Sequence, residues 1–150
     1  MKTGLYEIDF YRWTVEQSDR LRLGDLDGLD LENLAEEIAS LGKQQQQELR
    51  NRLGVLLGHL LKWEYQSDKR SKSWVFTIKE QRRELIFLIA DNPSLKSYLS
   101  EAILRGYAQG FDLAVKETNL KRKDFPQKCP YTIAQIFDEN FPDEINEDFD

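Results

Sequence analysis

The stretch LRNRLGVLLGHLLKW, residues 49–63, decides the fold of this chain. Its apolar residues recur three and four positions apart, a spacing that gathers side chains on one face of an α-helix. The members of this stripe are Leu49, Leu53, Leu56, Leu60 and Trp63. An earlier stripe with the same spacing comprises Leu31, Leu34, Ile38 and Leu41. Gly42 and the glutamines 44–47 separate the two stripes. Because glutamine is a good helix former, we expect one continuous helix, with a break at Gly42 as the alternative.

Helical periodicity continues on both sides of this segment, and no sustained alternation of apolar and polar residues indicates a strand. The expected helices cover approximately residues 9–23, 30–63, 73–91, 95–118 and 132–141. Thr132 and Gln135, three residues apart, form a capping box for the last of them. The sequence therefore predicts an all-α fold: a single-domain, irregular bundle of about four main helices plus a short C-terminal helix. We expect this domain to occupy residues 1–142, and residues 143–150 to form an acidic, frayed tail.

Gly106 and Gly110 lie four residues apart on one face of the expected fourth helix. A glycine inside a helix costs about 1 kcal/mol relative to alanine, so two at this spacing need a compensating reason. We expect another helix or a bulky ring to approach closely at this face.

The composition of the 150 residues, 40% hydrophobic and 32% charged, is typical of soluble globular proteins. No run approaches the ~20 apolar residues that a membrane-spanning helix needs, and the N-terminus lacks the apolar core of a signal peptide. Cys129 is the only cysteine, which excludes an intrachain disulfide and a cysteine-based zinc site. We therefore expect a cytoplasmic protein with no membrane contact, no metal and no cofactor.

The net charge of −6 is unevenly spread, because both ends of the chain are acidic while the middle is basic. The cations of the middle are Lys62, Lys69, Arg70, Lys72, Lys79, Arg82 and Arg83. We expect the basic segment, residues 69–83, to pair with the acidic ends, within the chain or across a partner. A nucleic-acid-binding module that uses this segment is the alternative, although the overall negative charge argues against a general phosphate binder.

Several short motifs together resemble a known family. They are Tyr6, Asp9, Phe10 and Trp13, then Leu34–Ile38, His59–Trp63, Ser73–Trp74, Gln81–Arg82 and Cys129–Thr132. The pattern resembles an uncharacterised helical family, the twenty-ninth family of the domains of unknown function, which is abundant in cyanobacteria. The resemblance covers nearly the whole chain and implies a small, cytoplasmic, bacterial, all-helical protein. It implies no established activity, substrate or partner.

His59, the only histidine, is the first candidate for chemistry because its unperturbed pKa lies near neutral pH. One interpretation is a half-buried structural histidine that hydrogen-bonds a carboxylate or carbonyl from a neighbouring helix. The other includes Arg52, seven residues earlier. This spacing is similar to the arginine–histidine motif of HEPN-type ribonucleases, although Leu53 replaces the polar residue that commonly follows the arginine. There, His59 would act as the acid/base and Arg52 would clamp the phosphate.

Glu36 and Glu37 are candidate carboxylates that could orient His59 or join a metal site. On a continuous helix Glu37 and His59 would lie ~33 Å apart, so within one chain they could not meet. Solvated charges near the positive end of a helix are therefore the favoured interpretation.

A candidate binding surface for an anionic partner combines cations with two tryptophans. It comprises Lys62, Trp63, Lys69, Arg70, Trp74, Arg82 and Arg83. The rings could stack on a ligand while the cations hold its charge. The alternative is that the tryptophans lie in the core and the cations are solvated.

The sequence favours a non-enzymatic function. The first hypothesis is a protein-interaction domain that binds a protein partner or a second copy of itself, including partners of a toxin–antitoxin or stress-response type. The second is a metal-independent ribonuclease that uses His59 and Arg52. The third is a nucleic-acid-binding module that uses residues 69–83.

Overall fold

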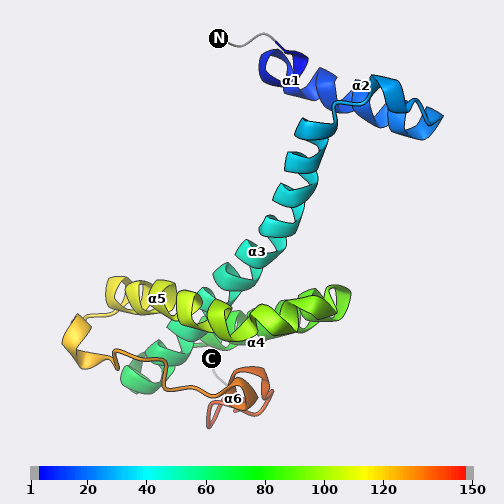
Figure 1. Ribbon diagram of the computed structural model, residues 1–150. Helices are drawn as coiled ribbons and strands as arrows, with labels where there is room; N and C mark the ends of the chain where they lie inside the picture. Colours follow the sequence, from blue (N-terminus) through cyan, green and yellow to red (C-terminus); the bar gives the residue numbers. More distant parts are fainter. Residues whose placement is uncertain (1–3, 148–150) are drawn as a thin grey trace. The chain divides into compact units, whose positions relative to one another are not determined.

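The computed structural model describes residues 4–147, and this part of the chain contains helices and no strand (Figure 1). The α-helices are α1 (Leu5–Ile8), α2 (Phe10–Leu23), α3 (Leu31–Tyr65), α4 (Lys72–Asp91), α5 (Leu99–Glu117) and α6 (Ile133–Phe137). Four 3-10 helices lie between them: η1 (Leu26–Gly28), η2 (Ser67–Lys69), η3 (Pro93–Tyr98) and η4 (Arg122–Asp124). The all-α fold predicted from the sequence is confirmed.

Helix α3 is continuous over 35 residues and passes through Gly42 without a break. A β-carbon placed on Gly42 would meet no atom within 4 Å, so this glycine packs against nothing. The two apolar stripes therefore belong to one helix, as expected. The chain nevertheless divides into two compact units, Met1–Gln44 (unit 1) and Gln45–Asp150 (unit 2), and α3 contributes to both.

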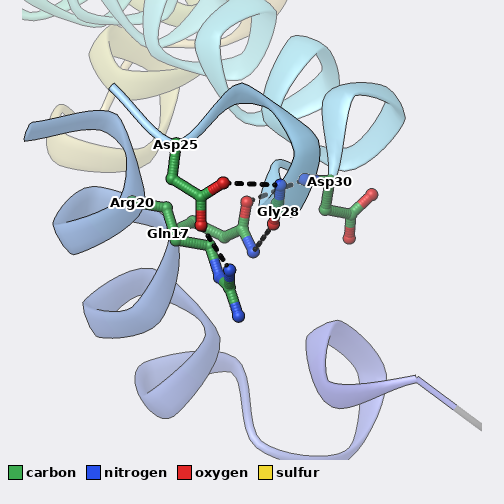
Figure 2. Close-up of polar contacts among 5 residues, drawn as sticks. All are labelled: Gln17, Arg20, Asp25, Gly28 and Asp30. Carbon is green, nitrogen blue, oxygen red and sulfur yellow. Dashed lines mark hydrogen bonds and ion pairs between the residues drawn. The ribbon is translucent and has the colours of Figure 1, made fainter. Parts of the chain in front are cut away.

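In unit 1, a tightly bonded turn joins α2 to α3 (Figure 2). Arg20 Nη1 donates to Asp25 Oδ2 at 2.8 Å, and Asp25 Oδ1 accepts the Gly28 amide at 3.3 Å. Gln17 bonds both sides of the turn: its Nε2 donates to the Gly28 carbonyl at 3.4 Å, and its Oε1 accepts the Asp30 amide at 2.8 Å. These contacts pair backbone groups of Gly28 and Asp30 within the turn, and they fix its conformation.

Aromatic side chains complete unit 1. Trp13 packs edge-on to Tyr6, with ring centroids 4.8 Å apart, and stacks on Phe10 at 5.7 Å. Trp13 Nε1 also donates to Asp30 Oδ2 at 3.0 Å, so a polar bond fixes the ring on the first turn of α3.

In unit 2, α3 packs against α5 through four glycines. Gly54 and Gly58 of α3 face Gly106 and Gly110 of α5, with the backbones in close approach. A β-carbon on Gly110 would lie only 2.7 Å from both the Gly54 oxygen and the Gly58 nitrogen. The close approach predicted from Gly106 and Gly110 is thus confirmed. The core around this crossing includes Leu49, Leu53, Leu56, Leu57, Leu60, Leu61, Ile78, Leu85, Ala102 and Ala114.

Three expected helix ends were wrong. Helix α4 begins at Lys72 and is capped by Ser71, two residues before the expected cap Ser73, because the Ser71 hydroxyl accepts the Trp74 amide. The region after Asn92 first forms η3, where the Ser97 hydroxyl donates to the Ser94 carbonyl three residues back, and α5 follows. Helix α6 has the predicted capping box of Thr132 and Gln135, but it ends at Phe137, before the expected Phe141.

The structure describes residues 143–147 of the expected tail, and these residues are anchored where fraying was expected. The Trp63 indole donates to the Asp143 carbonyl at 3.1 Å, and Arg70 pairs with Glu144 at 2.7 Å. Ile145 is only 1% exposed, in the core. The apolar side chain of Ile145 therefore anchors this segment, although most of its residues are acidic or polar. Residues 148–150 lie outside the described part.

Candidate functional site

His59 is buried in the core of unit 2, with 9% of its surface exposed. Its Nδ1 lies 2.8 Å from the Val55 carbonyl oxygen, which can only accept, so Nδ1 carries the proton. Burial lowers the pKa of His59, and the nearby Lys62 ammonium lowers it further. The imidazole is therefore neutral at pH 7, and its hydrogen-bond partner lies within its own helix, whereas a partner on a neighbouring helix was expected.

Arg52 has protein partners on both sides of its guanidinium. Its Nε donates to Glu48 Oε1 at 3.0 Å, and its Nη1 donates to Gln81 Oε1 of α4 at 3.3 Å. A phosphate clamp would have to give up these bonds. Arg52 and His59 line none of the cavities described below.

The setting of His59 makes stability depend on pH. The folded pKa lies below the ordinary value near 6.5, so the unfolded chain binds the proton more readily. Stability from the neutral imidazole is fully present above about pH 6.5 and is lost as the pH falls toward the folded pKa. We expect His59→Gln to flatten the dependence of the unfolding free energy on pH below 6.5, measured by urea denaturation against wild type. An unchanged slope would contradict this assignment.

Much of the expected binding surface is structural. Lys62 is 4% exposed, with its Nζ 2.9 Å from Glu117 Oε1 and 4.7 Å from the centre of the Trp74 ring. Trp63 is fully buried, and the Arg70 guanidinium covers its ring at 4.6 Å. The two cations contact the tryptophan rings and form ion pairs with carboxylates of the chain, and the Trp63 ring packs in the core.

The remaining cations of that surface differ in exposure. Lys69 is exposed on η2. Arg83 is exposed, whereas Arg82 is 3% exposed, and both line a cavity of about 620 Å³. Of the seven residues predicted for an anion-binding surface, only Arg82 and Arg83 meet at one of the described cavities.

Glu36 and Glu37 differ in role. Glu36 is exposed, and Glu37 accepts a hydrogen bond from the Tyr6 hydroxyl, which raises the pKa of Tyr6. Both belong to unit 1, whereas His59 belongs to unit 2. Across residues 4–147, no three side chains of the His, Cys, Asp and Glu types are grouped so that they could hold a metal ion. None of the helices in this part combines the length and apolar character that crossing a membrane requires.

Unit 1 exposes most of its large apolar side chains. We call this set the unit 1 apolar surface: Ile8, Phe10, Tyr11, Val15, Leu21, Leu23, Leu26, Leu31, Ile38 and Leu41. Among the described residues of unit 1, Trp13 is the one large apolar side chain that is buried. Phe10 and Leu21 of this set are about half exposed.

Sequence reasoning missed this surface because Leu31, Ile38 and Leu41 have the same spacing as the buried stripe of residues 49–63. Spacing identifies the apolar face of a helix, and burial depends on what packs against that face. The available signal was the ratio of apolar to acidic residues. Residues 4–44 contain ten acidic and four basic residues, so their apolar side chains stand among many charged ones.

Comparison with known proteins gives one match. No curated protein and no solved structure matches the chain. A family model described as "Domain of unknown function DUF29" matches residues 5–142, nearly the whole chain. The chain therefore belongs to the DUF29 family of helical proteins of unknown function.

Proposed function

We propose that this protein is an interaction module that binds a basic amphipathic helix of a partner protein on the unit 1 apolar surface. The observation that carries the proposal is the exposure of ten large apolar side chains within unit 1. Exposed large apolar side chains among charged ones are typical of protein-binding surfaces. The fixed turn between α2 and α3 supports the proposal, because a rigid surface loses less entropy on binding.

The negative charge of unit 1 indicates which kind of partner its apolar surface would bind. Residues 4–44 carry a net charge of −6, so two copies of this surface would bring like charges together. A helix with an apolar stripe and lysine or arginine rims would place opposite charges at the edge and bury its stripe at the centre. A different protein with such a helix therefore fits better than a second copy of this chain.

The setting of this interaction stays a prediction. We propose a cytoplasmic, bacterial protein, and we include toxin–antitoxin and stress-response pairs among the systems that could supply the basic helix. A ribonuclease is not favoured, because His59 is buried and bonded to Val55 and Arg52 bonds to Glu48 and Gln81. RNA cleavage that survives a chelator and disappears in His59→Gln would contradict this choice.

The proposal is tested with two synthetic 21-residue peptides that share one leucine stripe and differ only in lysine or glutamate rims. We expect the lysine-rim peptide to bind, and its affinity to fall at least tenfold between 50 and 300 mM NaCl, because salt screens the rim charges. The glutamate-rim peptide should bind at least tenfold more weakly at low salt. Fluorescence anisotropy of labelled peptides measures both. Equal binding of the two peptides, or binding of neither, would contradict the proposal.

A further inference from the structure

Two neighbouring cavities in unit 2 have opposite character. The cationic cavity, of about 620 Å³, has Lys79, Arg82 and Arg83 in its lining, which also includes Glu139, Asn140 and Asn146. Its three cations and one carboxylate give the lining a net charge of +2, in a chain whose net charge is −6. Within residues 4–147, Arg83 is the one of these three cations that forms an ion pair, with Glu84 at 3.7 Å.

Arg82 is the buried cation in the lining of this cavity. Its Nε donates to the Ile136 carbonyl at 2.8 Å, and its Nη2 donates to the Gln135 carbonyl at 3.5 Å, so one edge of the guanidinium holds α6. Arg82 Nη1 is buried and is the one buried side-chain polar atom in residues 4–147 without a hydrogen-bond partner. Buried donors are almost always paired, so an unpaired nitrogen on a residue that lines a cavity indicates a missing acceptor.

The apolar cavity, of about 650 Å³, adjoins the cationic one at Ile86, which lines both. Its lining includes Ile89 of α4, Pro93 of η3, and Ile133 and Phe137 of α6. Ile86 and Ile133 are exposed at its surface. Positive charge and apolar surface thus lie next to each other along α4 and α6.

We propose that the two cavities together bind an anionic amphiphile, a single-chain molecule with a phosphate or carboxylate head and an alkyl tail. The head lies among Lys79, Arg82 and Arg83, whose positive charges bind it. The tail covers Ile86 and continues toward Phe137. The net charge of +2 in the lining matches one phosphate monoester. This site lies within unit 2 and is independent of the function proposed for unit 1.

Dodecyl phosphate, used below its micelle concentration, is the probe. We expect one molecule to bind per chain by isothermal titration calorimetry, at least tenfold more tightly than inorganic phosphate and than the neutral dodecyl maltoside. Shortening the tail should weaken binding about two- to fourfold per methylene removed, because each buried methylene contributes to affinity. Phosphate or maltoside binding as tightly as dodecyl phosphate, or affinity independent of tail length, would overturn the proposal.

Variants locate the site. Lys79→Gln/Arg83→Gln removes two exposed charges and should lower the affinity for dodecyl phosphate at least tenfold, with the helical circular dichroism unchanged. The matched control is Arg105→Gln/Lys116→Gln on α5, two exposed cations away from both cavities, which should bind like wild type. Equal losses in the two double variants would overturn the site. So would tighter binding of a 12-nucleotide single-stranded RNA than of dodecyl phosphate, because a strand would be the better occupant of these cations.

Discussion

Replacing Gly110 by alanine is expected to lower the free energy of unfolding by at least about 2 kcal/mol, a cost of overpacking partly offset by alanine's helix propensity. The new β-carbon would lie 2.7 Å from the Gly54 oxygen and the Gly58 nitrogen. Both are backbone atoms of α3, which no rotamer change can move away. The helices must separate, and the core packed around the crossing loses contact.

Gly42→Ala is the matched control, because it makes the same chemical change in the middle of a helix. No atom lies within 4 Å of the β-carbon position of Gly42, so the substitution adds helix propensity without a clash. We expect it to stabilise the helix by about 0.5–1 kcal/mol. Urea denaturation followed by circular dichroism measures both variants. A Gly110→Ala protein as stable as wild type would show that α3 and α5 do not approach closely at this point.

The double variant Ile38→Ser/Leu41→Ser is expected to lower affinity for the lysine-rim peptide at least tenfold. Ile38 is 67% exposed and Leu41 is 60% exposed, so both can transfer apolar area from water to a partner. Fully burying one such side chain contributes about 1.5–3 kcal/mol. Because both are exposed in the free protein, the unfolding free energy should change by less than about 0.5 kcal/mol.

Phe76→Ser is the control for this loss. Phe76 is 63% exposed on α4 in unit 2 and lines none of the described cavities, so its substitution removes comparable apolar surface elsewhere. Wild-type affinity is expected. An equal loss with Phe76→Ser, or no loss with the double variant, would show that the peptide does not bind at unit 1.

Sequence periodicity predicted the helices well because local spacing determines which face of a helix is apolar. It could not tell that Leu49 and Leu53 are buried while Ile38 and Leu41 are exposed. That difference arises from α5, whose Gly106 and Gly110 allow it to pack on residues 49–63. The glycines were visible in the sequence, but their partners, Gly54 and Gly58, were not recognised as part of the same crossing.

The candidate site was less predictable than the fold. Lys62 and Arg70 were predicted to belong to a surface that binds an anionic partner, and the structure places them in contact with Trp74 and Trp63, respectively. Arg82 was identified as a cation of that surface. Its burial and its unpaired Nη1 depend on the carbonyls of α6, which lies more than fifty residues away in sequence. Contacts between residues so far apart in the sequence produce no recognisable pattern in the sequence around either residue.

The most direct test of the interaction proposal is photocrosslinking in the native cell, with a benzophenone amino acid at position 38 and, as the control, at position 76. The account predicts a specific crosslink from position 38 to a partner protein, and none from position 76. Mass spectrometry should locate the crosslink in an amphipathic segment rich in lysine or arginine. A crosslink to an acidic segment or to a second copy of this chain, or no specific crosslink from position 38, would contradict the account.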